Sequence, residues 1–165
     1  MLLETPRPDL GTSAPDFTLK DAAGTGYRRD DLAGANGLLV AFICKHCPFV
    51  IRIAAQLAQD IKTLKATGIE TVLINANDYQ TYTQDAPQHM PDFVATHGLT
   101  APYVIDETQD TARAYGAVCT PDFFGYDSEM KLKYRGRLDE LVDGMTQGIA
   151  SDAQLPSMGC SLKWR

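Results

Sequence analysis

Two continuous apolar runs separated by a helical pattern dominate the first half of the chain. Residues 38–43 are apolar without alternation, which is typical of a central strand covered on both faces. After Pro48, apolar side chains recur at helical spacing, and Gly68 supplies a stop signal behind them. Those apolar positions are Val50, Ile53, Ala54, Leu57, Ile61 and Leu64. Residues 69–74 form the second apolar run, so residues 38–74 predict one strand–helix–strand unit.

Shorter patterns predict further elements on both sides of this unit. Residues 14–20 alternate enough for a short strand, which the glycine-containing residues 23–26 turn back. Residues 123–126 and 131–134 flank a polar turn and predict a hairpin. The remaining expected elements are an irregular lead-in over residues 1–14, a helix over 85–97, a strand over 103–105, a helix over 108–115 and a weak last helix over 144–153. Since no repeat, low-complexity segment or linker interrupts the chain, residues 1–165 are predicted to form a single domain.

Composition and charge narrow the class of protein. The 165 residues are 44% hydrophobic and 22% charged, which is ordinary globular usage. The formal charge of −6 argues against an electrostatic nucleic-acid binder, because such a protein needs a basic face. No stretch approaches the roughly 18 apolar residues of a membrane span, and the N-terminus lacks the basic start and apolar run of a secretory signal. We therefore expect a cytoplasmic protein that binds neither nucleic acid nor membranes.

The cysteines carry the chemistry that the pattern predicts. Four cysteines are too few for a disulfide-scaffolded secreted chain of this length, so a close pair is interpreted as catalytic or metal-binding. Cys44 and Cys47 form such a pair directly after the predicted buried strand, and Pro48 suits the first turn of a helix. Because a helix N-terminus favours a thiolate, the hypothesis is that Cys44 attacks a disulfide and Cys47 resolves the mixed disulfide. Lys45 and His46 add positive charge, which favours the thiolate and a more oxidising couple.

A metal site is the competing interpretation of the same residues. Cys44, His46 and Cys47 could supply zinc ligands together with a distant Cys119 or Cys160. Against this interpretation, His46 lies between two cysteines of one short turn, and the sequence contains no second paired cluster. A pair of inert buried cysteines is the third interpretation. The context of a CxxC beside a strand–helix–strand unit favours redox chemistry, with no metal and no other cofactor.

Several short motifs, in order along the chain, resemble one known family. They are APDF at 14–17, CKHCPFV at 44–50, NAND at 75–78, CTPDFF at 119–124, YRGR at 134–137 and GCSLKW at 159–164. On these motifs the chain resembles the thioredoxin-like superfamily, and within it the alkyl hydroperoxide reductase/thiol-specific antioxidant (redoxin) type with a CxxC. The resemblance implies an α/β thioredoxin-like fold, with a mixed sheet flanked by helices and an N-terminal strand extension.

The resemblance also implies roles for residues far from the cysteine pair. It implies that Pro121 is a cis-proline facing the pair, and a Thr-Pro just before a strand is independently a place for a cis bond. Thr120 would then offer backbone groups to an extended substrate. Cys119 is either an inert buried thiol or a third redox cysteine near the site. Cys160, near the C-terminus, is open to pairing with Cys119, to bridging two subunits, or to remaining a thiol.

The expected oxidoreductase activity has three forms that the sequence leaves open. The preferred function is thiol–disulfide oxidoreduction of protein or small-molecule disulfides, with an unidentified thiol as electron donor. A thiol-dependent peroxidase acting on hydroperoxides is the alternative, although such enzymes carry Pro and Thr or Ser seven and three residues before the reactive cysteine. Seven and three residues before Cys47 the chain has Val40 and Cys44, and the same positions before Cys44 are Gly37 and Ala41. Neither cysteine therefore matches the peroxidase pattern. A redox-sensing module without enzymatic activity is the third form.

Patterns alone do not identify the acid–base groups of the reaction. Leu38 stands where thioredoxin carries a buried acid, so His46 or water is left as the proton acceptor of Cys47. His89 and His97 are expected on an exposed helix. The acidic candidates are Asp78, Asp85, Asp92 and Asp106, which lie on separate elements and predict no carboxylate dyad. The candidates for an arginine at a peroxidase site are Arg113, Arg135 and Arg137.

Overall fold

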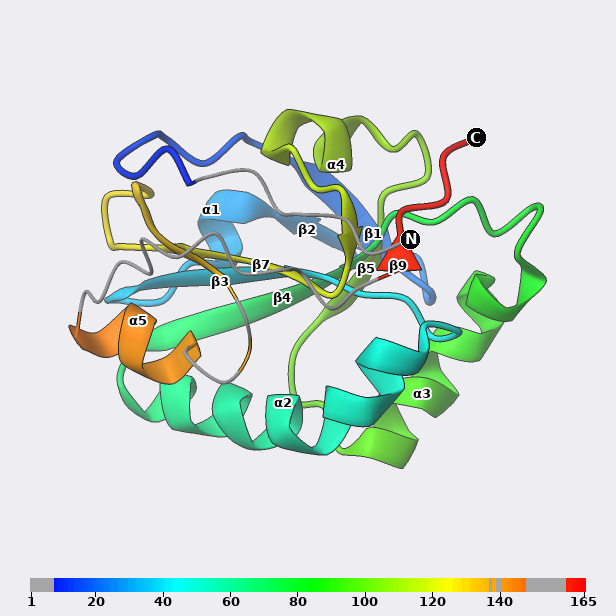
Figure 1. Ribbon diagram of the computed structural model, residues 1–165, viewed down its shortest axis with the longest axis horizontal. Helices are drawn as coiled ribbons and strands as arrows, with labels where there is room; N and C mark the ends of the chain where they lie inside the picture. The colour runs from blue at the N-terminus through cyan, green and yellow to red at the C-terminus, as the bar shows by residue number, and fades with distance from the viewer. Residues whose placement is uncertain (1–7, 137, 139–140, 148–159) are drawn as a thin grey trace.

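A mixed seven-stranded sheet forms the centre of the molecule (Figure 1). The computed structural model describes residues 8–136, 138, 141–147 and 160–165. In sheet order the strands are β2 (Gly26–Arg28), β1 (Thr18–Asp21), β5 (Tyr103–Ile105), β4 (Ile69–Asn75), β3 (Gly37–Phe42), β7 (Asp122–Tyr126) and β8 (Leu132–Gly136). β4 pairs in parallel with both β3 and β5, whereas the other neighbours are antiparallel. The predicted α/β fold with a mixed sheet and an N-terminal strand extension is confirmed.

Helices cover both faces of this sheet (Figure 1). The helices α2 (Pro48–Ala66), α3 (Met90–His97) and α5 (Leu141–Gln147) lie on one face, and α1 (Arg29–Leu32) and α4 (Asp110–Tyr115) lie on the other. An apolar core lies on each face of the sheet, and successive side chains of β3 point to opposite faces. Leu39 packs in the core on the α2 side, and Val40 packs in the core on the α4 side. Every residue of β3 is buried, which is the physical reason why its sequence shows no alternation.

The helix α2 follows the predicted periodicity from its first turn to its end. Pro48 occupies the first turn, where its missing N–H costs no hydrogen bond. Val50, Leu57 and Leu64 are buried on the face toward the sheet. Gly68 follows the helix with a φ of 83°, a conformation that suits glycine, and its N–H donates to the carbonyl of Lys65. The predicted strand–helix–strand unit is therefore confirmed.

The predicted helix over 85–97 is wrong in its first half. Two short 3-10 turns, η1 (Thr83–Asp85) and η2 (Pro87–His89), precede α3. The backbone of Ala86 is extended (ψ 149°), because a proline disfavours the helical conformation of the residue before it. The helix therefore begins only at Met90 and ends, as predicted, at Gly98.

Two other expected elements shift at their ends. The helix predicted over 108–115 is α4, which begins at Asp110 and ends before Gly116 in the left-handed conformation. The last helix begins at Leu141 rather than at Gly144, and the part of the expected helix over 148–153 lies outside the described residues. The predicted hairpin is confirmed as β7 and β8, with a register shift at Gly125 and Tyr126.

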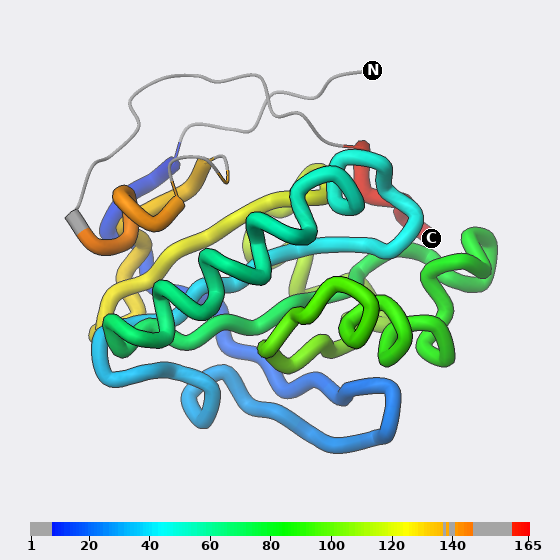
Figure 2. The backbone as a smooth tube through the Cα atoms, turned by 90° about the horizontal axis from the view of Figure 1, so that it is seen from below, coloured from blue at the N-terminus to red at the C-terminus, as the bar shows by residue number. Residues whose placement is uncertain are grey.

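A second, two-stranded sheet was not predicted. It joins β6 (Cys119–Thr120) to β9 (Cys160–Ser161) in antiparallel register. Both strands have only two residues, too few to show a period in the sequence. Figures 1 and 2 place β9 beside the loop at the start of α2. The chain's C-terminal segment thus meets the region of the CxxC.

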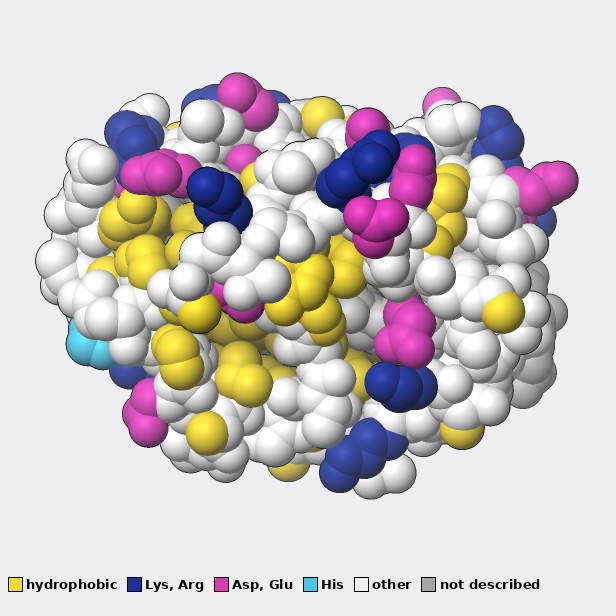
Figure 3. All heavy atoms as spheres, turned by 180° about the vertical axis from the view of Figure 1, so that it is seen from behind, with side chains coloured by type: hydrophobic (Ala, Val, Ile, Leu, Met, Phe, Trp, Pro, Cys, Tyr) yellow, Lys and Arg dark blue, Asp and Glu magenta, His cyan; other side chains and the backbone are white. Residues whose placement is uncertain are grey.

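The surface agrees with the composition in the part of the chain that the structure describes. On the face opposite that of Figure 1, basic and acidic side chains are interspersed around hydrophobic ones, and the described residues form no broad basic area there (Figure 3). No helix among the described residues is both long and apolar enough to cross a membrane.

Candidate functional site

The C-K-H-C motif forms a turn between the carboxyl end of β3 and the first residue of α2. β3 ends at Phe42 and α2 begins at Pro48, so Cys47 is the residue that caps the helix and Cys44 lies one turn earlier. Lys45 and His46 are partly exposed in this turn, whereas both cysteines are buried. The cysteine nearest to the positive end of the helix dipole is therefore the second one, not the first as the sequence suggested.

Thr120 contacts both sulfur atoms. Its hydroxyl Oγ1 lies 3.1 Å from Cys44 Sγ, and its carbonyl oxygen accepts a hydrogen bond from the Cys47 thiol at 3.2 Å. The peptide bond between Thr120 and Pro121 is cis, as the resemblance implied. The structure thus brings the predicted residues Thr120 and Pro121 onto the cysteine pair from the opposite end of the sequence.

The two thiols differ in acidity, and the order is the reverse of the expected one. The pKa of Cys47 is lowered, first by a hydrogen bond from Cys44 and then by the N–H of Val50 and by the thiol and backbone of Cys160. The pKa of Cys44 is raised by the same hydrogen bond to Cys47, by burial and by the negative charge of Asp85. Burial and the hydrogen bond to the Thr120 carbonyl oppose the ionisation of Cys47, but the donors outnumber them. Of the two thiols, Cys47 is therefore the one whose surroundings favour ionisation.

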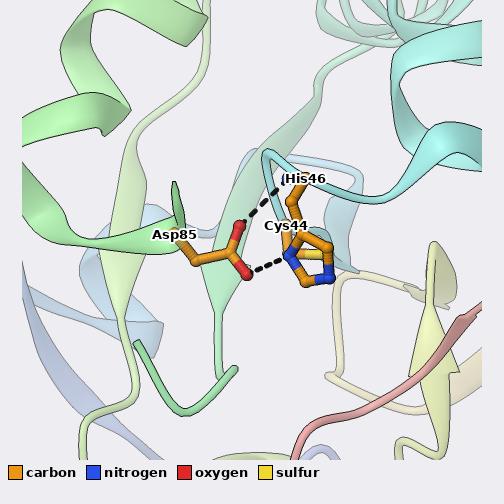
Figure 4. Close-up of side chains that lie close together, drawn as sticks. All are labelled: Cys44, His46 and Asp85. Carbon is orange, nitrogen blue, oxygen red and sulfur yellow. Dashed lines mark hydrogen bonds and ion pairs between the residues drawn. The ribbon is translucent and has the colours of Figure 1, made fainter. Parts of the chain in front are cut away.

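A buried carboxylate stands beside the pair, and sequence reasoning missed it. Asp85 is 1% exposed, and it accepts hydrogen bonds from the backbone N–H of His46 (3.0 Å) and from Asn77 Nδ2 (3.0 Å). Its second contact with His46 is to the ring atom Nδ1 (Figure 4). Asn75 donates to the Asp85 carbonyl at 2.8 Å and so holds this loop in place. The buried asparagines that follow an apolar strand were the available signal, because buried amides need buried partners.

His46 is held on more than one side. Its ring stacks on Tyr82, with centroids 5.6 Å apart and an angle of 7° between the planes. Lys163 of the C-terminal segment lies 5.5 Å from the centre of the Tyr82 ring. Together with Asp85, these contacts fix the orientation of the imidazole beside Cys44.

The structure places the two remaining cysteines differently. Cys160 pairs with Thr120 across the small sheet and packs against the core that contains Cys44 and Cys47. Cys119 precedes Thr120, and neighbouring residues of a strand point to opposite faces. Its sulfur lies 3.6 Å from the carbonyl oxygen of Pro121. Of the two auxiliary thiols, Cys160 is therefore the one that faces the pair.

Donor atoms of Cys44, His46 and Asp85 form the one group in the described residues that could hold a metal ion. One such atom from each residue lies within 4.8 Å of the others. Nδ1 of His46 and a carboxylate oxygen of Asp85 already contact one another, so this donor set satisfies itself without a metal. Cys119 and Cys160, the distant ligands that the zinc interpretation required, are not part of the group.

The candidate arginines are engaged elsewhere. Arg135 is buried, donates to Asp122 at 3.1 Å and lies over the Phe124 ring. Arg113 lies over the ring of Trp164. Arg137 lies outside the described residues. Both described arginines therefore have structural partners.

The charge of Asp85 predicts a measurable pH effect. Because that charge raises the pKa of Cys44, Asp85→Asn is expected to let Cys44 deprotonate at a lower pH, by about one pH unit. The measurement is the pH dependence of Cys44 alkylation, made in a Cys47→Ser/Cys160→Ser background so that only this thiol near the site reacts. The exposed Asp92→Asn is the matched control. An unchanged or higher midpoint in Asp85→Asn would contradict the assigned role of the carboxylate.

Comparison with known proteins finds related sequences. The sequence model of the AhpC/TSA family matches residues 10–135. The thiol-disulfide oxidoreductase ResA of Bacillus subtilis is 25% identical over 143 residues, which are 86% of this chain and 72% of that protein.

Solved structures show the same fold. The crystal structure of a hypothetical protein from Sinorhizobium meliloti superposes with a TM-score of 0.90 at 36% identity and covers 98% of each chain. The peroxidoxin BcpB of Mycobacterium tuberculosis has a TM-score of 0.67 at 18% identity, covering 84% of this chain and 94% of that one, and so shares the fold alone.

Proposed function

The chain belongs to the AhpC/TSA family, and from that premise we propose that it is a thiol–disulfide oxidoreductase that cycles Cys44 and Cys47 between dithiol and disulfide. The observation that carries the proposal is the pair of buried thiols at the carboxyl end of β3, with Thr120 in contact with both sulfurs. Two thiols that share one proton at a helix N-terminus form a reactive thiolate readily. The similarity to ResA, which is named a thiol-disulfide oxidoreductase, supports the same class of reaction.

The first step is assigned to Cys47. Its thiolate attacks one sulfur of a substrate disulfide, so a bond forms between Cys47 and that sulfur while the substrate S–S bond breaks. The first substrate thiolate leaves and takes up a proton from water. The cap position on α2 and the donors around Cys47 support this assignment over the one expected from the sequence.

The second step is assigned to Cys44, whose raised pKa makes a proton acceptor necessary. A ring nitrogen of His46 lies within 4.8 Å of the Cys44 sulfur, and Asp85 orients the ring (Figure 4). His46 takes the proton through one water. Cys44 then attacks Cys47, the Cys44–Cys47 bond forms, and the mixed disulfide breaks. The second substrate thiolate leaves with the proton of His46, so one disulfide has been reduced to two thiols and the pair has been oxidised.

Redox titration of the whole protein tests this proposal. The protein is equilibrated in glutathione buffers, quenched with acid, alkylated and digested with trypsin. Because Lys45 separates the two cysteines, they fall in different tryptic peptides, residues 30–45 and 46–52. The expected result is a two-electron transition in which the oxidised protein yields these two peptides joined by a disulfide. Absence of the link at every buffer ratio would overturn the proposal.

The same preparation separates the alternative functions. Catalytic reduction of insulin or of glutathione disulfide supports the proposed reaction. Consumption of a hydroperoxide in place of a disulfide would instead establish a peroxidase. A reversible disulfide with neither activity would leave a redox-sensing module.

His46 gives a prediction of its own. We expect His46→Gln to slow the resolving step about 10²-fold, because Cys44 loses its proton acceptor. In a Cys160→Ser background the mixed disulfide on Cys47 should then accumulate, and the defect should shrink as the pH rises and hydroxide replaces the imidazole. Acid quenching and intact-mass measurement follow both steps. His89→Gln is the control, and an effect of His46→Gln on the first step alone would refute this role.

A further inference from the structure

The burial of the cysteine pair raises the question of how an external thiol reaches it. Cys44 and Cys47 are each 0% exposed. Cys160 is only partly buried and packs against the same core. Because Cys160 is less buried than either cysteine of the pair and packs against the same core, a disulfide that includes Cys160 meets an external thiol more readily than the Cys44–Cys47 disulfide does.

The small β6–β9 sheet aims Cys160 at the pair. Thr120 and Cys160 are direct partners in its antiparallel register. Directly opposite residues project their side chains from the same face. The hydroxyl of Thr120 lies on the Cys44 sulfur, so the Cys160 side chain projects to that side as well. In agreement with this placement, the thiol and the backbone of Cys160 both lower the pKa of Cys47.

The segment that carries Cys160 is built into the fold. The N–H of Leu162 donates to the Val118 carbonyl at 3.0 Å, and the Leu162 side chain is buried. The carbonyl of Lys163 accepts from the Asp78 N–H at 2.9 Å and from Gln109 Nε2 at 2.8 Å. These contacts fix the residues that follow Cys160, so the position of Cys160 beside the cysteine pair is part of the tertiary structure.

We propose that Cys160 is a third redox thiol of this site. Cys160 displaces Cys44 from the Cys47 sulfur, so the disulfide moves from Cys44–Cys47 to Cys47–Cys160. The proposal rests on the proposed function, since the oxidised pair is its starting state. Cys160 gives up its proton to water and attacks the Cys47 sulfur. The Cys47–Cys160 bond forms, the Cys44–Cys47 bond breaks, and Cys44 leaves as a thiolate that takes up a proton. No electrons enter or leave in this exchange.

The exchange exposes the disulfide to an external thiol donor. The donor thiolate attacks the sulfur of Cys160, which is the less buried of the two linked residues, and Cys47 leaves as a thiolate. A lowered pKa makes Cys47 a good leaving group. A second donor thiol attacks the donor sulfur of the mixed disulfide, and Cys160 returns to the thiol. Two donor thiols have then become one donor disulfide, and the protein is reduced.

Peptide mapping of the oxidised variants tests the proposal. In Cys44→Ser/Cys119→Ser, equilibrated in oxidising glutathione buffer, we expect a monomeric protein in which residues 46–52 are linked to residues 138–163, the tryptic peptide of Cys160. The matched control Cys44→Ser/Cys119→Ser/Cys160→Ser should carry a glutathione adduct on Cys47 in place of that link. In oxidised wild type, the same 46–52 to 138–163 link should appear beside the Cys44–Cys47 link. Circular dichroism establishes that each variant is folded.

The outcomes separate this proposal from the proposed function. If wild type forms only the Cys44–Cys47 link and the Cys44→Ser variant carries glutathione on Cys47, Cys160 takes no part and the inference is overturned. If the Cys47–Cys160 link forms in both proteins and Cys44 stays reduced throughout, the proposed Cys44–Cys47 cycle fails instead. Should the Cys44→Ser variant not fold, the wild-type map decides: the link supports the exchange and its absence overturns it.

Discussion

Cys47→Ser abolishes disulfide-reducing turnover, by about 10³-fold or more, because it removes the sulfur that both proposed disulfides share. Cys47 is the cap of α2 and receives hydrogen bonds from both Cys44 and Cys160. Neither of those thiols can replace it, because burial and the charge of Asp85 still raise the pKa of Cys44 when Cys47 is gone, and burial still raises the pKa of Cys160. The measurement is turnover of glutathione disulfide with a dithiol donor.

Trapping identifies the attacking sulfur at the same time. In a Cys160→Ser background, glutathione disulfide should leave one stable adduct on Cys47 in the Cys44→Ser variant and none on Cys44 in the Cys47→Ser variant. Intact mass and tryptic mapping read the adducts, with Cys119→Ser as the control. A stable adduct on Cys44 in the Cys47→Ser variant would restore the order expected from the sequence, in which Cys44 attacks first.

Arg135→Met is expected to destabilise the protein by about 3–5 kcal/mol, because it leaves a buried carboxylate without its partner. The side chains of Arg135 and Asp122 are 7% and 2% exposed, and they lie 3.1 Å apart. Arg135 also donates to the Gly116 carbonyl at 2.8 Å. Asp122 directly follows Pro121 and is the first residue of β7. The ion pair therefore supports the start of the strand that follows the cis peptide bond between Thr120 and Pro121. Thermal and denaturant unfolding measure the loss.

The pH dependence of this loss has a definite sign. Burial already raises the pKa of Asp122, and Arg135 opposes that effect. Without Arg135 the pKa rises further, so the folded variant binds a proton more readily than the unfolded chain. The loss is therefore greatest at neutral pH and shrinks as the pH falls through that raised pKa. Asp122→Asn/Arg135→Met should recover most of the stability. If it does not, the loss comes from packing against Phe124 instead of from the charge.

Local pattern was enough to predict the centre of the fold. Two apolar runs predicted β3 and β4, and one helical repeat predicted α2. A strand that is buried on both faces is apolar throughout, whereas a helix that is buried on one face has apolar residues at helical spacing. Gly68 and Gly98 ended their helices as predicted, since both adopt the left-handed conformation. The α3 prediction failed at Pro87, where a local backbone restriction overrode a plausible helical pattern.

The candidate site was only partly predictable. The CxxC pair and the Thr120–Pro121 element were recognised as short motifs, and the structure brings them into contact. Asp85 was not recognised, because its importance depends on burial next to His46, and its own neighbours in sequence carry no such signal. The order of the two thiol pKa values also differed from expectation, because Cys44, Val50 and Cys160 lower the pKa of Cys47 while burial and the charge of Asp85 raise that of Cys44.

By itself, the sequence determined that this chain builds a thioredoxin-like α/β sheet with two thiols at the end of its central strand. Those features depend on residues close together along the chain, where hydrophobic period and motif spacing act directly. Only the tertiary structure decided that Cys160 and not Cys119 faces the pair, and that Asp85 stands behind His46. Both contacts join segments far apart in sequence through strands and turns of two or three residues, too short to have a period of their own. The acidity of a thiol is set by such neighbours, so it follows from the folded chain and not from the motif.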